Sequence, residues 1–306
     1  MGISLTERQE REIEAFCEIA GENGALLSLR ELLGLAGIEA SEPELAAVWG
    51  SSMLGSKFIL QSGYVVDRTR AGPDPHVTVG AEDVRRRKAR ENLRIASEFG
   101  RCLGRGTILV SVSGGNSYLS AGEGEDIDFF CVTSSDGMWA FMLRALLLAR
   151  VHSLANKRTP QLCFSCVMDE RQARKEFSER HDPIFARDAL TARVIIGNTA
   201  YNALLKSAGW MGDFFPSFYA LRLRETEPPG GWVAGTDRSS VILNELLRHT
   251  LGAFLKMKSW ALNRRLAKRS RHSAVFQTRV EKGYYLYESN RYRKLRRMYS
   301  EVAKKA

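Results

Sequence analysis

The sequence predicts an α/β protein of the α+β type, organised around a mixed sheet. Three observations lead to this expectation. Helix caps and a hairpin signal fill the first 75 residues, apolar strand-like runs alternate with a helical pattern over 107–168, and the pattern beyond 183 is helical. Because 306 residues exceed a usual single domain, we expect three parts: 1–75, a core at 81–182, and a helical C-terminal region at 183–306.

Three capping boxes predict the helices of the N-terminal part. Thr6 with Gln9 begins a helix through about Ala20, Ser28 with Glu31 begins a short one, and Ser41 with Glu44 begins a third. Residues 57–69 then form two short β runs around Gln61-Ser62-Gly63, which is a hairpin signal. Three short helices followed by a hairpin is the order of a winged-helix-like module. Its third helix, EPELAAVWGSSML, has no Arg or Lys, so we favour a structural or protein-contact role over DNA reading.

The middle of the chain alternates between helix and strand signals. Residues 70–80 resemble a linker, with two prolines and two glycines, and a helix should follow from about Ala81 to Leu103. Arg85, Arg86, Arg87, Lys88 and Arg90 stand at the front of this helix, either as phosphate contacts or as a solvated face. Strands are expected at 107–113, 126–133 and 161–168, with a helix beginning near Asp136. Further helices are expected near 186–208, 239–268 and 288–304, with a Pro-Gly loop at 228–231.

The second of these strands carries two acids in the pattern Asp126-Ile127-Asp128. Because side chains alternate along a strand, both carboxylates should project from one face while Ile127 faces the core. Two neighbouring carboxylates repel each other, and a hard divalent cation removes that repulsion. Mg²⁺ is typically bound by one or two carboxylates together with substrate phosphates. The pair therefore predicts a metal site, with Mg²⁺ or Mn²⁺ as the ion.

The first strand ends in Ser113-Gly114-Gly115-Asn116-Ser117. Gly114 and Gly115 allow a close approach of the backbone to a ligand, and amides at a following helix start attract an anion. The side chains of Ser113, Asn116 and Ser117 can add hydrogen-bond donors. Alone, this run is more often a simple turn. With paired aspartates eleven and thirteen residues after Gly115, it predicts a phosphate cradle opposite a metal site.

These residues resemble the nucleotidyltransferase superfamily, which has the polymerase-beta-like fold. Its pattern is a small-residue pair after a strand, then about ten residues, then an Asp-x-Asp strand; Gly114, Gly115, Asp126 and Asp128 match it. The chain is also similar to uncharacterised prokaryotic nucleotidyltransferase-domain proteins with an N-terminal winged-helix-like segment. That similarity covers 85–220 and includes the Arg-rich helix, Trp139 and the strand QLCFSCVM.

The resemblance implies an Mg²⁺-dependent enzyme that transfers a nucleoside monophosphate from an NTP to a hydroxyl of RNA or a small molecule. Asp126 and Asp128 would hold the metal, and the backbone of Gly114 and Gly115 would hold the β- and γ-phosphates. Active members of the superfamily have a third carboxylate on a later strand, where this chain offers Ser165 instead. Asp169 follows that strand, and Asp188 on the next helix falls where similar proteins tend to carry an acid.

Charge and cysteine content indicate the partners, the localisation and the state of the thiols. Residues 251–306 contain 16 Lys and Arg against 3 acids, a net charge of +13 in a chain whose total is +10. This basic region indicates a polyanionic partner such as nucleic acid, although a solvated helical face explains it equally. Because the sequence shows neither a signal-peptide pattern nor a long apolar run, we expect a cytoplasmic protein without a membrane partner. Five cysteines predict free thiols, including Cys163 and Cys166 of the CxxC.

Two functional hypotheses follow. The first is the nucleotidyltransferase, and the second is a noncatalytic nucleotide- or nucleic-acid-binding protein that uses the same fold without a third carboxylate. A winged-helix regulator is weakened by the uncharged third helix. The oligomeric state, the nucleotide and the acceptor stay open.

Overall fold

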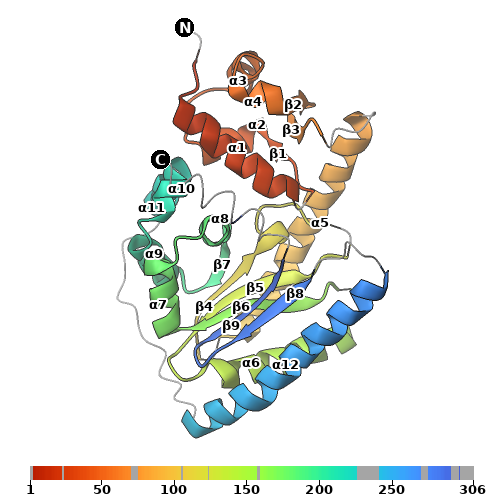
Figure 1. Ribbon diagram of the computed structural model, residues 1–306, viewed down its shortest axis with the longest axis vertical. Helices are drawn as coiled ribbons and strands as arrows, with labels where there is room; N and C mark the ends of the chain where they lie inside the picture. The colour runs from red at the N-terminus through yellow and green to blue at the C-terminus, as the bar shows by residue number, and fades with distance from the viewer. Residues whose placement is uncertain are drawn as a thin grey trace.

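A computed structural model describes residues 3–22, 24–69, 75–104, 106–122, 124–156, 159–225, 241–269, 275–290 and 296. The chain is a mixed α/β protein with a six-stranded sheet in the order β7-β4-β5-β6-β9-β8 (Figure 1). The strands are β4 (Thr107–Ser113), β5 (Ile127–Thr133), β6 (Leu162–Asp169), β7 (Arg193–Ile196), β8 (Phe276–Val280) and β9 (Tyr284–Ser289). β5 and β6 are parallel and the other pairs are antiparallel, so the sheet is mixed.

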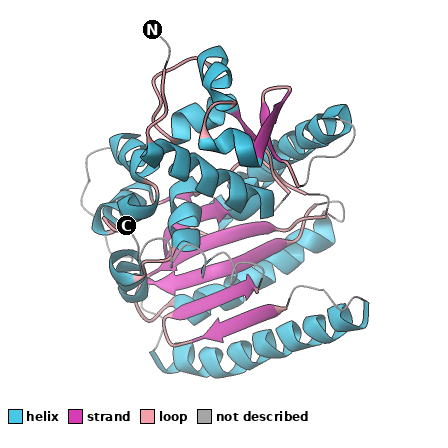
Figure 2. Cartoon of the chain, turned by 45° about the horizontal axis from the view of Figure 1, so that its top comes forward, coloured by secondary structure: helices cyan, strands magenta, loops and turns pink. Residues whose placement is uncertain are grey.

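Helices cover both faces of this sheet (Figures 1 and 2). One face packs against α5 (Pro75–Cys102), α6 (Met138–Ala155) and α12 (Val241–Arg269). The other face packs against α7 (Glu170–Glu179), α8 (Pro183–Thr191) and α9 (Asn198–Ser207), followed by α10 (Met211–Phe214) and α11 (Pro216–Glu225). Side chains of β5 point alternately to the two faces of the sheet. Phe129 and Cys131 pack in the hydrophobic cluster under α5, α6 and α12, and Phe130 and Val132 pack in the cluster under α7, α8 and α9. A strand buried on both faces explains the continuous apolar run FFCV.

The N-terminal part forms the helices and hairpin that its caps predict. Its elements are α1 (Glu7–Glu22), β1 (Leu27–Ser28), α2 (Leu29–Leu35), α3 (Glu42–Trp49), α4 (Met53–Lys57), β2 (Phe58–Gln61) and β3 (Tyr64–Asp67). The capping boxes at Ser28 and Ser41 are confirmed by reciprocal hydrogen bonds with Glu31 and Glu44. The hairpin between β2 and β3 is confirmed as well, and β1 joins it to give a sheet in the order β1-β3-β2.

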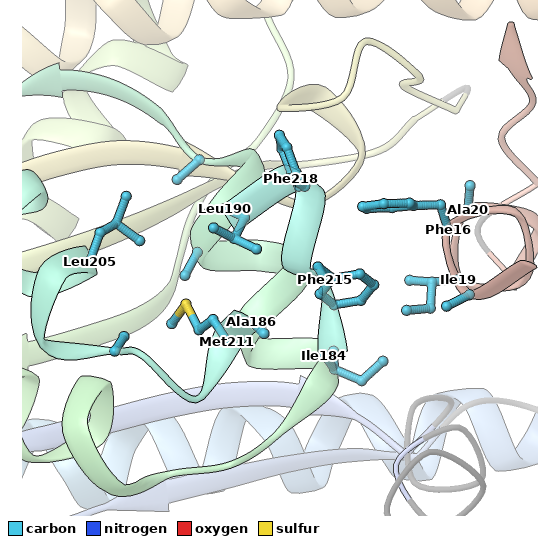
Figure 3. Close-up of a cluster of buried hydrophobic side chains, with 14 of the residues drawn as sticks. Phe16, Ile19, Ala20, Ile184, Ala186, Leu190, Leu205, Met211, Phe215 and Phe218 are labelled. Carbon is cyan, nitrogen blue, oxygen red and sulfur yellow. The ribbon is translucent and has the colours of Figure 1, made fainter. Parts of the chain in front are cut away.

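This N-terminal part packs on the sheet domain through α1 (Figure 3). The ring of Phe16 lies 4.8 Å from that of Phe215 and 5.6 Å from that of Phe218, measured between ring centroids. Glu12, which is 2% exposed, accepts hydrogen bonds from the backbone amides of Ser217 and Phe218 at 3.1 and 3.2 Å. These amides belong to the first turn of α11 and have no partner within the helix. A side chain of α1 therefore caps a helix about two hundred residues later.

Replacing Glu12 by alanine should lower the free energy of unfolding by about 2 kcal/mol, because two buried amides lose their acceptor. Urea denaturation followed by circular dichroism measures this change. Glu12→Gln retains an acceptor oxygen and should cost less than half as much. Equal losses in the two variants would contradict the capping role.

Three expectations about secondary structure are wrong. The proposed linker at 70–80 overlaps α5, which begins at Pro75. The single helix expected near 186–208 is two helices separated by β7, where the β-branched run Val194–Ile196 pairs with β4 and Gly197, at φ 89°, ends the strand. The C-terminal region is not entirely helical, because β8 and β9 extend the main sheet. Ser289 is the last residue of β9, so a helix cannot begin at 288. Residues 291–304, except Arg296, and the loop at 228–231 lie outside the described residues.

Candidate active site

The glycine bend and the paired acids meet where β4 and β5 run side by side. Ser113 and Asp128 are register partners in the antiparallel pair, so the bend after Ser113 lies beside Asp128. Gly114 has φ 66°, a conformation that side chains disfavour, and begins a short 3-10 turn through Asn116. A Cβ atom at Gly114 would lie 3.3 Å from Oδ2 of Asp128. The glycine bend and the Asp128 carboxylate are therefore neighbours, with no room for a side chain between them.

Asp126 and Asp128 face the same cavity. This cavity, of about 440 Å³, is lined by Ser113, Gly114, Gly115 and both aspartates, and α8 forms its opposite wall. Ile127 between them is fully buried in the cluster on the other face of the sheet. The strand alternation that the sequence predicts is thus observed, although β5 begins at Ile127, one residue after Asp126.

The two acids are held in an electrostatically unfavourable arrangement. Burial raises the pKa of Asp128 to about 7, and the neighbouring negative charge of Asp126 adds to the rise. Burial also raises the pKa of Asp126, while the positive charge of Lys258 on α12 lowers it. Burying two like charges together costs free energy unless a cation compensates them. The strands therefore impose a repulsion that a bound cation would relieve.

A bulge in β6 provides hydrogen-bond donors to Asp128. Between the partners Asp128–Cys163 and Phe130–Cys166, β6 has one residue more than β5. Two consecutive residues, Ser165 and Cys166, consequently both line the cavity, which a regular strand does not allow. The side chains of Cys163 and Ser165 form hydrogen bonds with the Asp128 carboxylate and lower its pKa. The CxxC sequence thus has a positioning role here, and its thiols are free.

The structure distinguishes between the candidates for a third acid. Asp169 is the register partner of Thr133, at the opposite end of β5, and its side chain caps α7 by accepting from the Gln172 amide at 2.8 Å. Asp169 is therefore not part of the cavity. Asp188 on α8 does line it, forms an ion pair with Arg187 at 2.7 Å, and raises the pKa of Asp128 through its charge. Over the described residues, no three Asp, Glu, His or Cys side chains are grouped closely enough to hold a metal by themselves.

Two residues expected to bind phosphate use their side chains inside the protein. Asn116, 2% exposed, accepts from the Asn92 amide at 2.8 Å and donates to the Asp126 carbonyl at 3.0 Å. Ser117 is fully buried and donates to the Gly114 carbonyl at 2.7 Å. Neither lines the cavity, so they hold the bend and the acid-bearing segment in place. Ser113, Gly114 and Gly115 are the residues of this run that face the cavity.

Basic side chains on the cavity wall come from places that the motif does not indicate. Arg180, Arg187 and Arg296 line it, and each forms an ion pair with a nearby acid. Arg187 is 4% exposed, with its guanidinium 5.3 Å from the Tyr118 ring centroid. By contrast, the Arg-rich start of α5 is absent from this cavity: Arg85 bonds Ser120, and Arg86 bonds Glu31 of the N-terminal part. In the sequence, the adjacent basic and acidic residues Arg187 and Asp188 are the one local indication of this cavity wall.

A second cavity of about 440 Å³ meets the first at Asp126. It lies between α6, α12 and strands β6 and β9, and it shares Asp126, Cys163, Phe276 and Tyr287 with the first cavity. Lys258 and Arg265 of α12 stand at its edge, and Gln161 donates to Oδ2 of Asp126 at 3.2 Å. Asp126 is therefore accessible from two separate spaces.

Comparison with known proteins gives no relative. No family model, curated protein or solved structure matches this chain. The resemblance drawn from the motif therefore stays an expectation, and any functional assignment depends on the cavity and the residues that line it.

Replacing Gly114 by alanine should lower the free energy of unfolding by about 1 kcal/mol, because the backbone there adopts φ 66°. The new methyl group would also press on Asp128. Gly50→Ala is the matched control, since Gly50 has ordinary helical angles and open space where the methyl would stand. Thermal melts of both variants measure the effect. Equal melting temperatures would show that the bend tolerates a side chain.

Proposed function

We propose that this protein is a divalent-metal-dependent nucleotidyltransferase, which transfers a nucleoside monophosphate from an NTP to a hydroxyl acceptor. The observation that carries the proposal is that the Gly114 bend lies beside Asp128 and lines one cavity together with Asp126 and Asp128. A turn with exposed amides suits an anionic group, and adjacent carboxylates suit a hard cation. A metal–triphosphate complex satisfies both at once.

The residues fit Mg²⁺ or Mn²⁺ as the ion. Two carboxylates together with phosphate oxygens and water are a usual Mg²⁺ ligand set, and Asp126 and Asp128 would hold it. When bound, the ion would neutralise charge that develops on the transferring phosphoryl group. The Gly114-Gly115 backbone would orient the β- and γ-phosphates, and Cys163 and Ser165 would orient the Asp128 carboxylate. Arg180 and Arg187, which also line the cavity, would add positive potential.

Two cavities that meet at Asp126 provide room for two substrates. A volume of about 440 Å³ lies within the range of small-molecule sites, 300–1,000 Å³. We place the NTP in the cavity beside the glycine bend and the acceptor hydroxyl on the side of the second cavity. Lys258 and Arg265 at that second cavity favour an anionic acceptor, and nucleic acid that reaches it along the basic C-terminal region is one such acceptor.

Labelled ATP, GTP, CTP and UTP, each with Mg²⁺ or Mn²⁺, test the proposal in the presence of total RNA or a metabolite extract. The expected result is label attached to an acceptor, with release of pyrophosphate. The double variant Asp126→Ala/Asp128→Ala should form no product, whereas Asp213→Asn, at an exposed acid of α10, should behave as the wild type. Equal product from wild type and the double variant would reject the proposal.

The absence of a three-acid group among the described residues favours a second candidate, a noncatalytic nucleotide-binding protein on the same fold. Fluorescent ATP and GTP analogues separate the two. Metal-dependent binding that is lost in Asp128→Ala, without transfer to any acceptor fraction, would support the second candidate over the first.

A further inference from the structure

The outer surface of α6 and α12 is unusually apolar. The two helices pack against each other on one face of the sheet (Figure 1). Large apolar side chains that are 37–81% exposed follow both helices: Leu143, Leu147, Val151 and Leu154 on α6, and Val241, Ile242, Leu243, Leu246, Phe254, Met257 and Trp260 on α12. Both helices bury their inner sides on the same sheet face, so these side chains point away from it together. Contiguous exposed apolar surface of this extent marks an interaction site.

The pattern along α12 is that of a helix which packs against another helix. Exposed residues recur at alternating steps of three and four, as in the a and d positions of a coiled coil: Leu243, Leu246, Thr250, Ala253, Met257, Trp260 and Arg264. The buried positions Asn244, Leu255 and Ser259 lie on the opposite side of the helix. One side of α12 therefore packs on its own sheet, and the opposite side carries an exposed stripe whose spacing suits a partner helix. α6 is also long and apolar enough to cross a membrane, a property that it shares with core helices of soluble proteins.

We propose that a second copy of this chain covers this surface, with the two α12 helices antiparallel and crossing at Ala253. In that arrangement Ala253 meets its own copy, Thr250 meets Met257, and Leu246 meets Trp260. Small residues at the crossing allow close approach of the helices, and the large residues fill the space on either side. The same pairs occur twice, as a two-fold interface requires.

Charge selects the antiparallel direction. Glu245, the single acid of α12, lies in its N-terminal half, whereas Lys258, Arg264, Arg265 and Lys268 lie in its C-terminal half. An antiparallel pair keeps the two basic C-terminal halves apart and sets each beside the N-terminal half of the other copy, where Glu245 is paired with Arg248 of its own helix. A parallel pair would bring the basic ends together, and like charges at an interface oppose association.

The size of the surface fits a stable dimer. From Leu243 to Trp260 the exposed stripe is about 26 Å long at 1.5 Å per residue, and two adjacent helices are about 20 Å wide. The apolar surface is therefore on the order of 500 Å² per copy, close to the lower bound for specific complexes, which is about 600 Å² per partner.

Sedimentation velocity at 1–50 µM tests the proposal, and the expected mass is twice the 34.3 kDa of the chain. Leu246→Glu and Trp260→Glu should each weaken self-association at least 100-fold, because each places a charge in an apolar layer. Val84→Glu is the matched control, since Val84 on α5 is 53% exposed but lies away from this surface. Circular dichroism of each variant should match the wild type, because the substituted side chains are exposed.

Oxidative cross-linking tests whether the two α12 helices cross at Ala253. In a Cys102→Ser background, which removes the exposed native thiol, Ala253→Cys should form a dimer through a disulfide on mild oxidation, whereas Val84→Cys should not. A wild type that is monomeric throughout the concentration range would overturn the proposal. So would a dimer that Leu246→Glu leaves intact, a dimer in which Ala253→Cys does not cross-link, or a monomer that co-floats with anionic lipid vesicles, which would assign the surface to a membrane.

Discussion

Replacing Asp128 by asparagine is expected to lower the rate of the proposed nucleotidyl transfer by roughly 10³-fold, equivalent to about 4 kcal/mol of transition-state stabilisation. Asparagine preserves the shape and the neighbours of the side chain but removes the charge that would hold the divalent ion. The loss should appear in kcat at saturating NTP, because the missing interaction acts on charge that develops during transfer. Steady-state kinetics with the acceptor found in the screen measures it.

The same substitution should have the opposite effect on stability. In the metal-free protein, the half-buried carboxylates of Asp126 and Asp128 repel each other, so Asp128→Asn should raise the free energy of unfolding by about 1 kcal/mol. Denaturation in EDTA at pH 8, where both acids of the wild type are charged, tests this sign. Asp213→Asn should change neither activity nor stability. A variant that loses both activity and stability would indicate a structural role for Asp128.

Trp139→Ala is expected to lower the free energy of unfolding by about 4 kcal/mol, the largest stability effect expected from one side chain in this protein. Trp139 on α6 is fully buried, packs edge-on to Tyr285 at 6.3 Å between ring centroids, and has Gly252 of α12 close by. Its indole Nε1–H donates to the carbonyls of Glu281 and Lys282 in the turn between β8 and β9, at 3.2 and 3.1 Å. One side chain thus joins α6, α12 and the last two strands.

Trp139→Phe separates packing from hydrogen bonding. Phenylalanine retains most of the apolar volume but has no donor, so it should cost about 1–2 kcal/mol. Chemical denaturation of the three proteins measures the series, and hydrogen exchange should show lost protection in β8 and β9 first. Alanine and phenylalanine variants of equal stability would mean that the cavity left by the indole ring is not what destabilises the alanine variant.

Local chemistry explains where prediction from the sequence succeeded. A Ser or Thr followed three residues later by Glu or Gln satisfies helix amides whatever surrounds it, and the boxes at Ser28 and Ser41 formed as expected. Strand alternation is equally local, so the common face of Asp126 and Asp128 followed from their spacing. The proximity of the Gly-Gly run to Asp128 does not follow from local spacing alone, because it depends on the pairing of β4 with β5.

Prediction failed where long-range pairing decides the structure. The runs that form β7, β8 and β9 are short, and each becomes a strand because an edge of the sheet is available to it: β4 for β7, and β6 for β9. The roles of Asn116 and Ser117 were misjudged for a related reason. A polar side chain next to a glycine bend can face a ligand or the interior, and Asn92 and the Asp126 carbonyl, both distant in sequence, set the choice for Asn116.

By itself, the sequence determined the helix caps, the strand alternation and the residues at the bend, because each depends on interactions within a few positions of the chain. The tertiary structure alone decided that Asp188 and not Asp169 lines the cavity of the two acids, that a β6 bulge brings Ser165 into that cavity, and that a second cavity meets Asp126. These features depend on how distant segments pack, since the direction of a side chain is fixed by register and by neighbours that local spacing does not specify.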